Sequence, residues 1–140
     1  MEWVVPMEPI TSNTIPTGRD WIYQIKWDGI RGLIYYQRGL DKQIRIFTKN
    51  KRERTDFYPE LHLIEDMIAG DSAVLDGELV VLGEDSKPSF QLSLIRERIG
   101  NPDKLPYYIK NLQVIYIVFD ILYYQGNKLT NQSLKERQEI

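Results

Sequence analysis

Residues 114–124, VIYIVFDILYY, constrain the fold of this chain more than any other segment. Nearly every residue in the run is β-branched, aliphatic or aromatic, which is typical of a β-strand. The run is too short to cross a membrane as a helix, and its apolar continuity predicts a strand buried on both faces. Asp120 interrupts the run and needs a partner wherever it is buried. We therefore expect a chain built around a β-sheet.

Turn residues divide the rest of the chain into short elements. Runs of β-formers predict further strands over residues 21–26, 31–37, 43–48 and 73–83. Helical spacing and capping residues predict helices over residues 59–69, 89–100 and 133–140. Prolines and polar residues predict an irregular lead-in over residues 1–20 and a loop over residues 101–113.

Composition excludes several kinds of chemistry. The 140 residues include no cysteine and one histidine, His62, so disulfides, thiolate-bound metals and multi-histidine metal sites are excluded. A formal charge of −2 is not that of a strongly basic nucleic-acid-binding chain. No apolar run is long enough to span a membrane, and the N-terminus lacks the pattern of a secretory signal. We therefore expect a cytoplasmic protein without a membrane partner.

The sequence KWDGIR, residues 26–31, combines a lysine, a tight-turn dipeptide and an arginine. Lys26 must be neutral to act as a nucleophile, and the ordinary pKa of lysine is about 10.4. A neighbouring cation such as Arg31, or a bound metal, lowers that pKa, whereas Asp28 raises it. Asp28 and Gly29 are therefore assigned to the turn. A solvated lysine beside a turn is the more common alternative for any single lysine.

Two carboxylates lie within the predicted strand over residues 73–83. Period-two alternation places Asp76 and Glu78 on one face, with Gly77 between them. Carboxylates among apolar residues are costly to bury without partners, so this pair is a candidate for contact with a metal or a ribose hydroxyl. Gly77 then allows a ligand to approach closely. An edge strand with one solvated face is an equally good explanation.

Two further features suggest contact with nucleotides. Phe119, at the centre of the apolar run, can stack on a base, although a core phenylalanine is the more common case. The loop over residues 49–54, which begins with Lys49, carries four cations and can bind phosphates. A solvated charged loop is its ordinary explanation.

Together and in this order, these segments resemble the nucleotidyltransferase domain of ATP-dependent DNA ligases, closest to the bacterial ones. KWDGIR at residues 26–31 matches the family signature lysine-x-Asp-Gly-x-Arg. LDGELV at 75–80 matches its Asp-Gly-Glu motif, and FDILYY at 119–124 its Phe-Asp-aliphatic-Leu motif. FYPEL at 57–61 and SFQLSLIRER at 89–98 resemble segments that lie between these motifs. The resemblance implies an α+β fold of antiparallel sheets and packed helices, an ATP-grasp-like adenylation domain.

The resemblance also implies a reaction and assigns residues to it. Lys26 is expected to attack the α-phosphorus of ATP, with Mg²⁺ neutralising the phosphates, and the adenylate then passes to a 5′-phosphate of nicked or broken DNA. A 3′-hydroxyl displaces AMP and seals the strand. Arg31 is expected to meet the ribose or a phosphate, and Glu78 the ribose hydroxyl or the metal. Phe119 is expected to stack on adenine, while Gln24 meets its edge.

The sequence departs from the family at two positions of the expected site. Lys49 stands where the family commonly has arginine, so the charge remains but the bidentate fork is lost. Gln24 stands where glutamate is frequent, and its amide can still accept a hydrogen bond from adenine. Asp76 is expected to be structural. Both Lys49 and Gln24 are kept as expected ATP-binding residues.

Other family features have no counterpart in the sequence. The later Glu-Gly motif, the Lys-x-Lys motif and the C-terminal OB-fold are missing, so residues 21–140 are expected to be the N-terminal part of the adenylation domain. We expect the chain to end inside a structural unit and not to complete ligation alone, with a second polypeptide as the source of the missing motifs. The alternatives are a non-catalytic nucleotide-binding or DNA-binding remnant and, less favoured, an RNA-ligase or capping-type nucleotidyltransferase.

Overall fold

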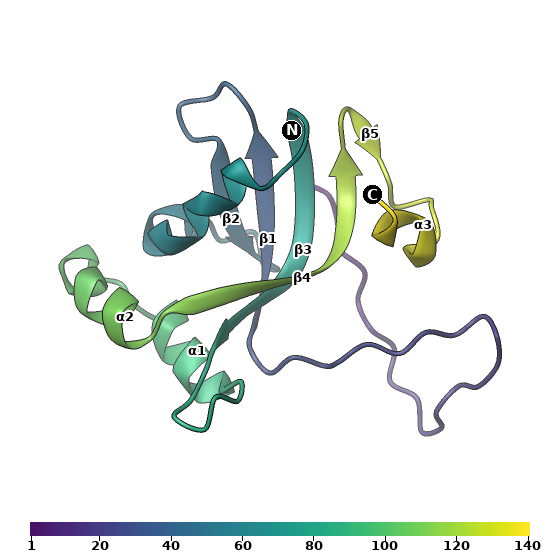
Figure 1. The fold of residues 1–140 in the computed structure, drawn as a ribbon, viewed down its shortest axis with the longest axis horizontal. Helices are drawn as coiled ribbons and strands as arrows, with labels where there is room; N and C mark the ends of the chain where they lie inside the picture. The colour runs from purple at the N-terminus through teal and green to yellow at the C-terminus, as the bar shows by residue number, and fades with distance from the viewer.

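A five-stranded antiparallel sheet forms the centre of the computed structural model, which describes all 140 residues (Figure 1). The strand order is β2-β1-β3-β4-β5, so β3 is central. The bounds are β1 (Ile30–Gln37), β2 (Ile44–Thr48), β3 (Ser72–Val81), β4 (Val114–Tyr124) and β5 (Asn127–Lys128).

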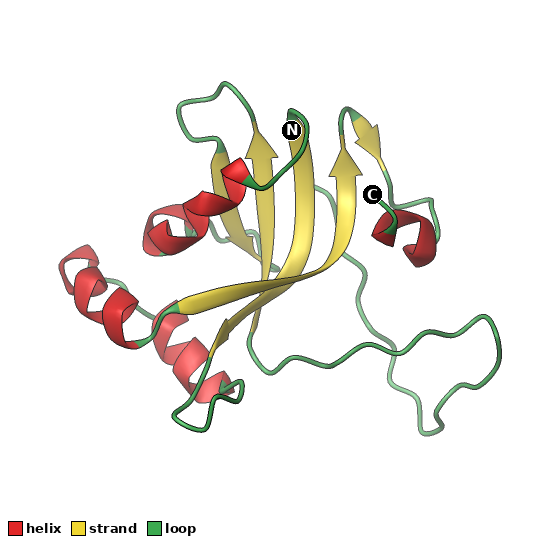
Figure 2. Cartoon of the chain, in the orientation of Figure 1, coloured by secondary structure: helices red, strands yellow, loops and turns green.

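Short helices surround this sheet, and Figure 2 distinguishes them by colour from the strands and loops. They are η1 (Thr55–Phe57), η2 (Pro59–Asp66), α1 (Phe90–Glu97), η3 (Pro102–Lys104), α2 (Leu105–Asn111) and α3 (Leu134–Gln138). α1 and α2 lie near the end of the sheet where β3 finishes and β4 begins, whereas α3 lies beside β4 (Figure 1). The predicted α+β class is confirmed. No helix is long and apolar enough to cross a membrane.

The two faces of the sheet carry separate apolar clusters. The larger cluster lies beneath η2 and includes Ile34, Ile46 and Leu79. The smaller one, on the opposite face, joins Leu33 and Val74 to the first residues of the chain. There the Val4 N–H donates a hydrogen bond to the Tyr35 hydroxyl at 2.8 Å, and the Trp3 ring stacks on the Tyr35 ring. The irregular N-terminal segment is thereby held against the sheet.

A buried ionic network joins the loop after β2 to α1. Arg54 donates to the carbonyl oxygens of Glu97 and Ile99 at 2.5 and 2.8 Å, and its Nε lies 3.3 Å from Glu97 Oε2. The Tyr58 hydroxyl donates to the same carboxylate oxygen at 2.7 Å. Arg54, one of the four cations in the loop over residues 49–54, is therefore a core residue, because Glu97 matches its charge and its Nε and Nη2 both donate hydrogen bonds.

Two strand predictions are wrong in part. Residues 21–26 form no strand, because no neighbouring strand is present to pair with their backbone, and the side chains of Tyr23 and Ile25 are exposed. β4 is not buried on both faces, since Ile115 and Val118 remain nearly half exposed. β5 pairs only with the last two residues of β4, so most of that edge is open. β-propensity reports a residue's fitness for a packed sheet, whereas the neighbours decide whether a strand forms.

The helices differ from their predicted type and bounds in smaller ways. The segment opened by Pro59 is helical but of the 3₁₀ type, and α1 ends at Glu97 rather than at Gly100. Residues 101–113, predicted as a loop, contain η3 and α2, with Pro106 in the first turn of α2, where a missing N–H is tolerated. The predicted Ser89 cap and the capping box of Ser133 are confirmed.

Gly77 supplies a test of the packing at the centre of the sheet. A Cβ on Gly77 would lie 2.6 Å from the Ile117 carbonyl oxygen and 2.6 Å from the Tyr116 ring. We expect Gly77→Ala to lower the free energy of unfolding by about 1–3 kcal/mol, since the backbone of β4 cannot yield easily. Urea denaturation measures the change. Gly100→Ala is the matched control, because no atom lies within 4 Å of its added Cβ. Equal effects of the two substitutions would contradict this packing argument.

Candidate active site

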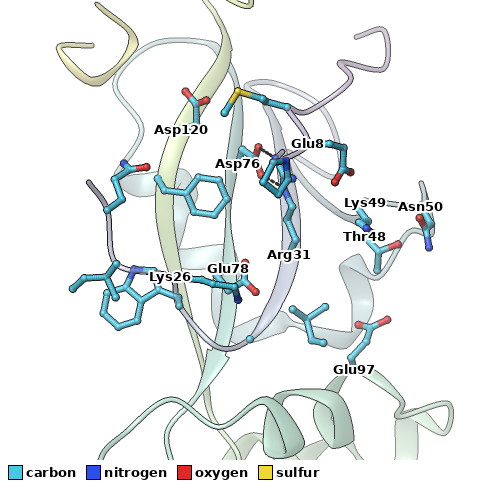
Figure 3. Close-up of a pocket in the computed structure, with 18 of the residues that line it drawn as sticks. Glu8, Lys26, Arg31, Thr48, Lys49, Asn50, Asp76, Glu78, Glu97 and Asp120 are labelled. Carbon is cyan, nitrogen blue, oxygen red and sulfur yellow. Dashed lines mark hydrogen bonds and ion pairs between the residues drawn. The ribbon is translucent and has the colours of Figure 1, made fainter. Parts of the chain in front are cut away.

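The expected site residues line one pocket of about 790 Å³ (Figure 3). β1, β3 and β4 form its floor, and the irregular segment before β1 and the turn after β2 form its sides. The structure brings together all six side chains expected to bind or react with ATP, namely Gln24, Lys26, Arg31, Lys49, Glu78 and Phe119. They come from four separate parts of the chain, at residues 24–31, 49, 78 and 119, so the fold gathers residues that the sequence keeps far apart.

Lys26 lies on the irregular segment that leads into β1, and its side chain extends over the sheet toward Glu78 (Figure 3). Gly29 allows this segment to lie close to β3. A Cβ on Gly29 would collide with the Leu79 carbonyl oxygen and lie 2.9 Å from Glu78 Cγ. Asp28 is exposed at the same bend. Gly29 therefore brings the lysine segment down onto the strand that carries Glu78.

Arg31 and Asp76 form a bidentate ion pair in the floor of the pocket. Arg31 Nε lies 3.0 Å from Asp76 Oδ1, and Nη2 lies 2.6 Å from Oδ2. Asp76 is only 1% exposed. The hydrogen bond to Asp76 raises the pKa of Arg31, while burial raises the pKa of Asp76 against the opposing charge of Arg31. Asp76 thus orients Arg31 and is not free to meet a ligand.

Glu78 is the carboxylate of the floor that remains available. It lies opposite Arg31 in the β1–β3 register, on the same face as Asp76. Burial raises the pKa of Glu78, and the charge of Lys26 and the backbone N–H of Gly29 oppose that rise. The prediction that Asp76 and Glu78 lie on one face of the strand is confirmed. The alternative of a solvated edge strand is wrong, because β3 is the central strand of the sheet.

Phe119 is placed in the pocket by an irregularity of β4. The register pairs Gly77 with Val118 and Asp76 with Asp120, which leaves Phe119 without a partner on β3. Such a bulge redirects a side chain relative to the regular alternation. The Arg31 guanidinium carbon lies 5.7 Å from the centre of the Phe119 ring. Phe119 is half-buried. One part of its ring can therefore pack on the sheet while another part remains open to a ligand.

Lys49 is exposed at the turn after β2, where Thr48, Asn50 and Arg52 also line the pocket. The buried pair of Arg54 and Glu97 anchors the far end of this loop. The loop is therefore fixed at both ends, and the cations that remain exposed, Lys49 among them, can reach a phosphate.

Sequence reasoning missed some lining residues. Met7, Glu8 and Pro9 line the pocket, although the lead-in was given no site role. The charge of Glu8 contributes to the raised pKa of Arg31. No linear signal marks these residues, because their position depends on the packing of Trp3 and Val4 against the sheet.

Carboxylates suited to a metal are few. No group of three or more His, Cys, Asp or Glu residues could hold an ion by itself. Asp76 is paired with Arg31, which leaves Glu78 as the donor beside Lys26. Mg²⁺ is usually bound through one or two carboxylates together with substrate phosphates, and Glu78 fits that mode.

Residues 6–140 match the family described as "ATP dependent DNA ligase domain". A multifunctional non-homologous end joining protein LigD of Pseudomonas aeruginosa is 32% identical over 97% of this chain, which spans 15% of that protein. The SPbeta prophage-derived DNA ligase-like protein LigB of Bacillus subtilis is 30% identical over 86% of the chain, which spans 40% of it. A structure of mycobacterial DNA ligase D complexed with ATP and MES superposes with a TM-score of 0.63 at 30% identity, covering 81% of this chain and 33% of that one.

Glu78 gives a pH-dependent prediction. A carboxyl group whose pKa is raised on folding destabilises the fold as pH rises through its titration range, because the folded state must carry a buried charge. We expect Glu78→Gln to melt a few degrees higher than the wild type at pH 7. The difference should shrink toward pH 4, where Glu78 is increasingly protonated. Thermal unfolding followed by circular dichroism measures both values, and a lower melting temperature at pH 7 would show that Glu78 is stabilising.

Proposed function

The chain belongs to the ATP dependent DNA ligase domain family, and from this premise we propose that it performs ATP-dependent adenylation in DNA joining, with Lys26 as the nucleophile. The observation that carries the proposal is the convergence of six separately expected side chains in one pocket. A volume of about 790 Å³ is within the range of nucleotide-sized sites. The relative solved in complex with ATP supports the same ligand.

The proposed step forms one bond and breaks one bond. The neutral amine of Lys26 attacks the α-phosphorus of ATP, an N–P bond forms, the bond to the β-phosphate oxygen breaks, and pyrophosphate leaves. Lys26 must first release one proton of its ammonium group to solvent, and its nitrogen releases a second proton once the N–P bond has formed. Arg31, oriented by Asp76, presents positive charge where the α-phosphate gains negative charge. Phe119 stacks on adenine, while Gln24 meets its edge and Glu78 meets the ribose.

Mg²⁺ would be held by the substrate phosphates together with Glu78, whose carboxylate is also the candidate contact of the ribose hydroxyl. When bound, it neutralises phosphate charge. Lys49 and Arg52 supply further positive charge at the turn after β2, where both side chains are exposed. The chain's own contribution is therefore mainly position and charge, which is what phosphoryl transfer requires.

The later steps concern DNA. A 5′-phosphate oxygen attacks the lysine-bound AMP, the N–P bond breaks and Lys26 is released. A 3′-hydroxyl then forms the phosphodiester bond and AMP leaves. The relatives named as an end joining protein and as a DNA ligase-like protein support nicked or broken duplex DNA as the substrate, in repair or recombination.

We also propose that further polypeptide covers the open side of the site. A second pocket of about 760 Å³, lined mainly by apolar residues, lies between residues 24–27 and β4. Ile25 and Val118, both in this lining, are 69% and 49% exposed. Exposed apolar surface of this kind favours association. A segment that carries the family's Glu-Gly and Lys-x-Lys motifs is the partner we propose.

Lys26 is tested by intact-mass spectrometry after incubation with ATP and Mg²⁺. We expect the wild-type chain to gain one AMP and Lys26→Ala to gain none, because alanine has no nucleophile. Lys110→Ala, on the exposed face of α2, is the matched control and should retain the adduct. A folded wild-type chain that gains no adduct but binds ATP would favour the non-catalytic alternative.

The polypeptide proposal is tested by hydrogen exchange. Adding a segment with the Glu-Gly and Lys-x-Lys motifs should slow amide exchange of residues 21–26 at least severalfold, because the backbone there gains partners. Val118→Asp should abolish that protection. Leu40→Asp, at the exposed turn between β1 and β2, should not. Unchanged exchange in the wild type would refute the proposal.

A further inference from the structure

Arg137 of α3 holds the strand that carries Phe119. Its Nε and Nη2 each lie 2.7 Å from a different oxygen of the Asp120 carboxylate. Its Nη1 donates to the Gln132 carbonyl oxygen at 2.5 Å, so all three guanidinium nitrogens are paired. Arg137 and Asp120 are both buried. Because both hydrogen bonds of this bidentate ion pair (the fork) are formed between buried groups, the Asp120 carboxylate and the Arg137 guanidinium are held in one relative orientation.

This fork acts on the residue that follows the bulge. Asp120 comes directly after Phe119, which has no partner on β3. The Asp120 carboxylate also accepts a hydrogen bond from the Ile121 N–H at 2.8 Å. The Asp120 side chain therefore holds the backbone just beyond the bulge, and Arg137 fixes the orientation of that side chain. The direction of Phe119 depends on that arrangement because the regular ladder is interrupted at this point.

The fork also balances charge beneath the pocket. Asp120 lies opposite Asp76 across the β3–β4 register, so two buried carboxylates are neighbours. Arg31 neutralises Asp76 and Arg137 neutralises Asp120. Without Arg137, Asp120 becomes an unpaired buried carboxylate, which is strongly unfavourable and attracts the nearest cation. Arg31 is paired with the neighbouring Asp76, and a move toward Asp120 would draw it off Asp76.

We propose that Arg137 is a positioning residue of the nucleotide site, which acts through Asp120 to direct Phe119 toward the base and to keep Arg31 on Asp76. The inference rests on the proposed function, in which Phe119 stacks on adenine. Arg137 lines the apolar second pocket and does not line the ATP pocket, so it exerts this effect without touching the ligand.

The position of Phe119 is tested first without nucleotide, by NMR of the full chain. Arg31 side-chain protons lie near the Phe119 ring and should show ring-current shifts that Phe119→Leu removes. We expect Arg137→Met to lose most of these shifts. Lys135→Met, an exposed substitution of the same charge change on α3, should keep them. Retention of the shifts in a folded Arg137→Met chain would overturn the proposal.

Ligand affinity then separates positioning from general damage. By calorimetry, we expect Arg137→Met to weaken ATP binding roughly tenfold or more, the scale of one lost base-stacking contact, and to weaken inorganic tripolyphosphate by a smaller factor, because both ligands lose Arg31 but only ATP also loses the stacking contact. Arg137→Lys keeps the charge without the fork and should weaken ATP severalfold, which keeps the test available if Arg137→Met fails to fold. Equal losses for both ligands, or an unchanged ATP affinity in Arg137→Lys, would overturn the proposal. A wild-type chain that shows the ring-current shifts but binds neither ligand would refute the proposed function alone.

Discussion

The pairing of two buried carboxylates with two arginines is the constraint on which the site depends. Asp76 and Asp120 lie opposite each other on β3 and β4, at the centre of the sheet. Arg31 comes from β1 and Arg137 from α3, so this one group of charges joins three strands and the last helix. Each carboxylate can be buried because a bidentate guanidinium matches it, and removal of either arginine would leave a charge without solvent or partner.

The geometry of the pocket follows from these pairs. Arg31, held by Asp76, faces the pocket beside Glu78 and lies near the Phe119 ring. The bulge in β4 leaves Phe119 without a pairing partner on β3, and Gly29 lets the Lys26 segment approach β3. A lysine, an arginine, a carboxylate and an aromatic ring thereby surround one volume. That combination suits a ligand with phosphate, ribose and base, which is why family membership and geometry support the same proposal.

Much of this could be predicted from local sequence. KWDGIR covers the segment that leads into β1, whereas LDGELV lies within β3 and FDILYY within β4. Charged and aromatic residues of these motifs line one pocket, among them Lys26, Arg31, Asp76, Glu78, Phe119 and Asp120. Residues 21–26 are the instructive failure. Their β-formers indicate a strand, yet a strand needs a neighbour, and none is present. Arg54 is a second case, because a cation in a charged run is expected to be solvated, and only the fold supplies Glu97.

By itself, the sequence determined the positions of β1 to β4, the antiparallel α+β class through its family resemblance, and the choice of six side chains that line one pocket. It also determined that Asp120 needs a partner, because an acidic residue within an apolar run cannot be buried unpaired. Only the tertiary structure decided that this partner is Arg137 and that Phe119 lies at a bulge. Partner choice and register depend on contacts between residues distant in the chain, which no local pattern encodes.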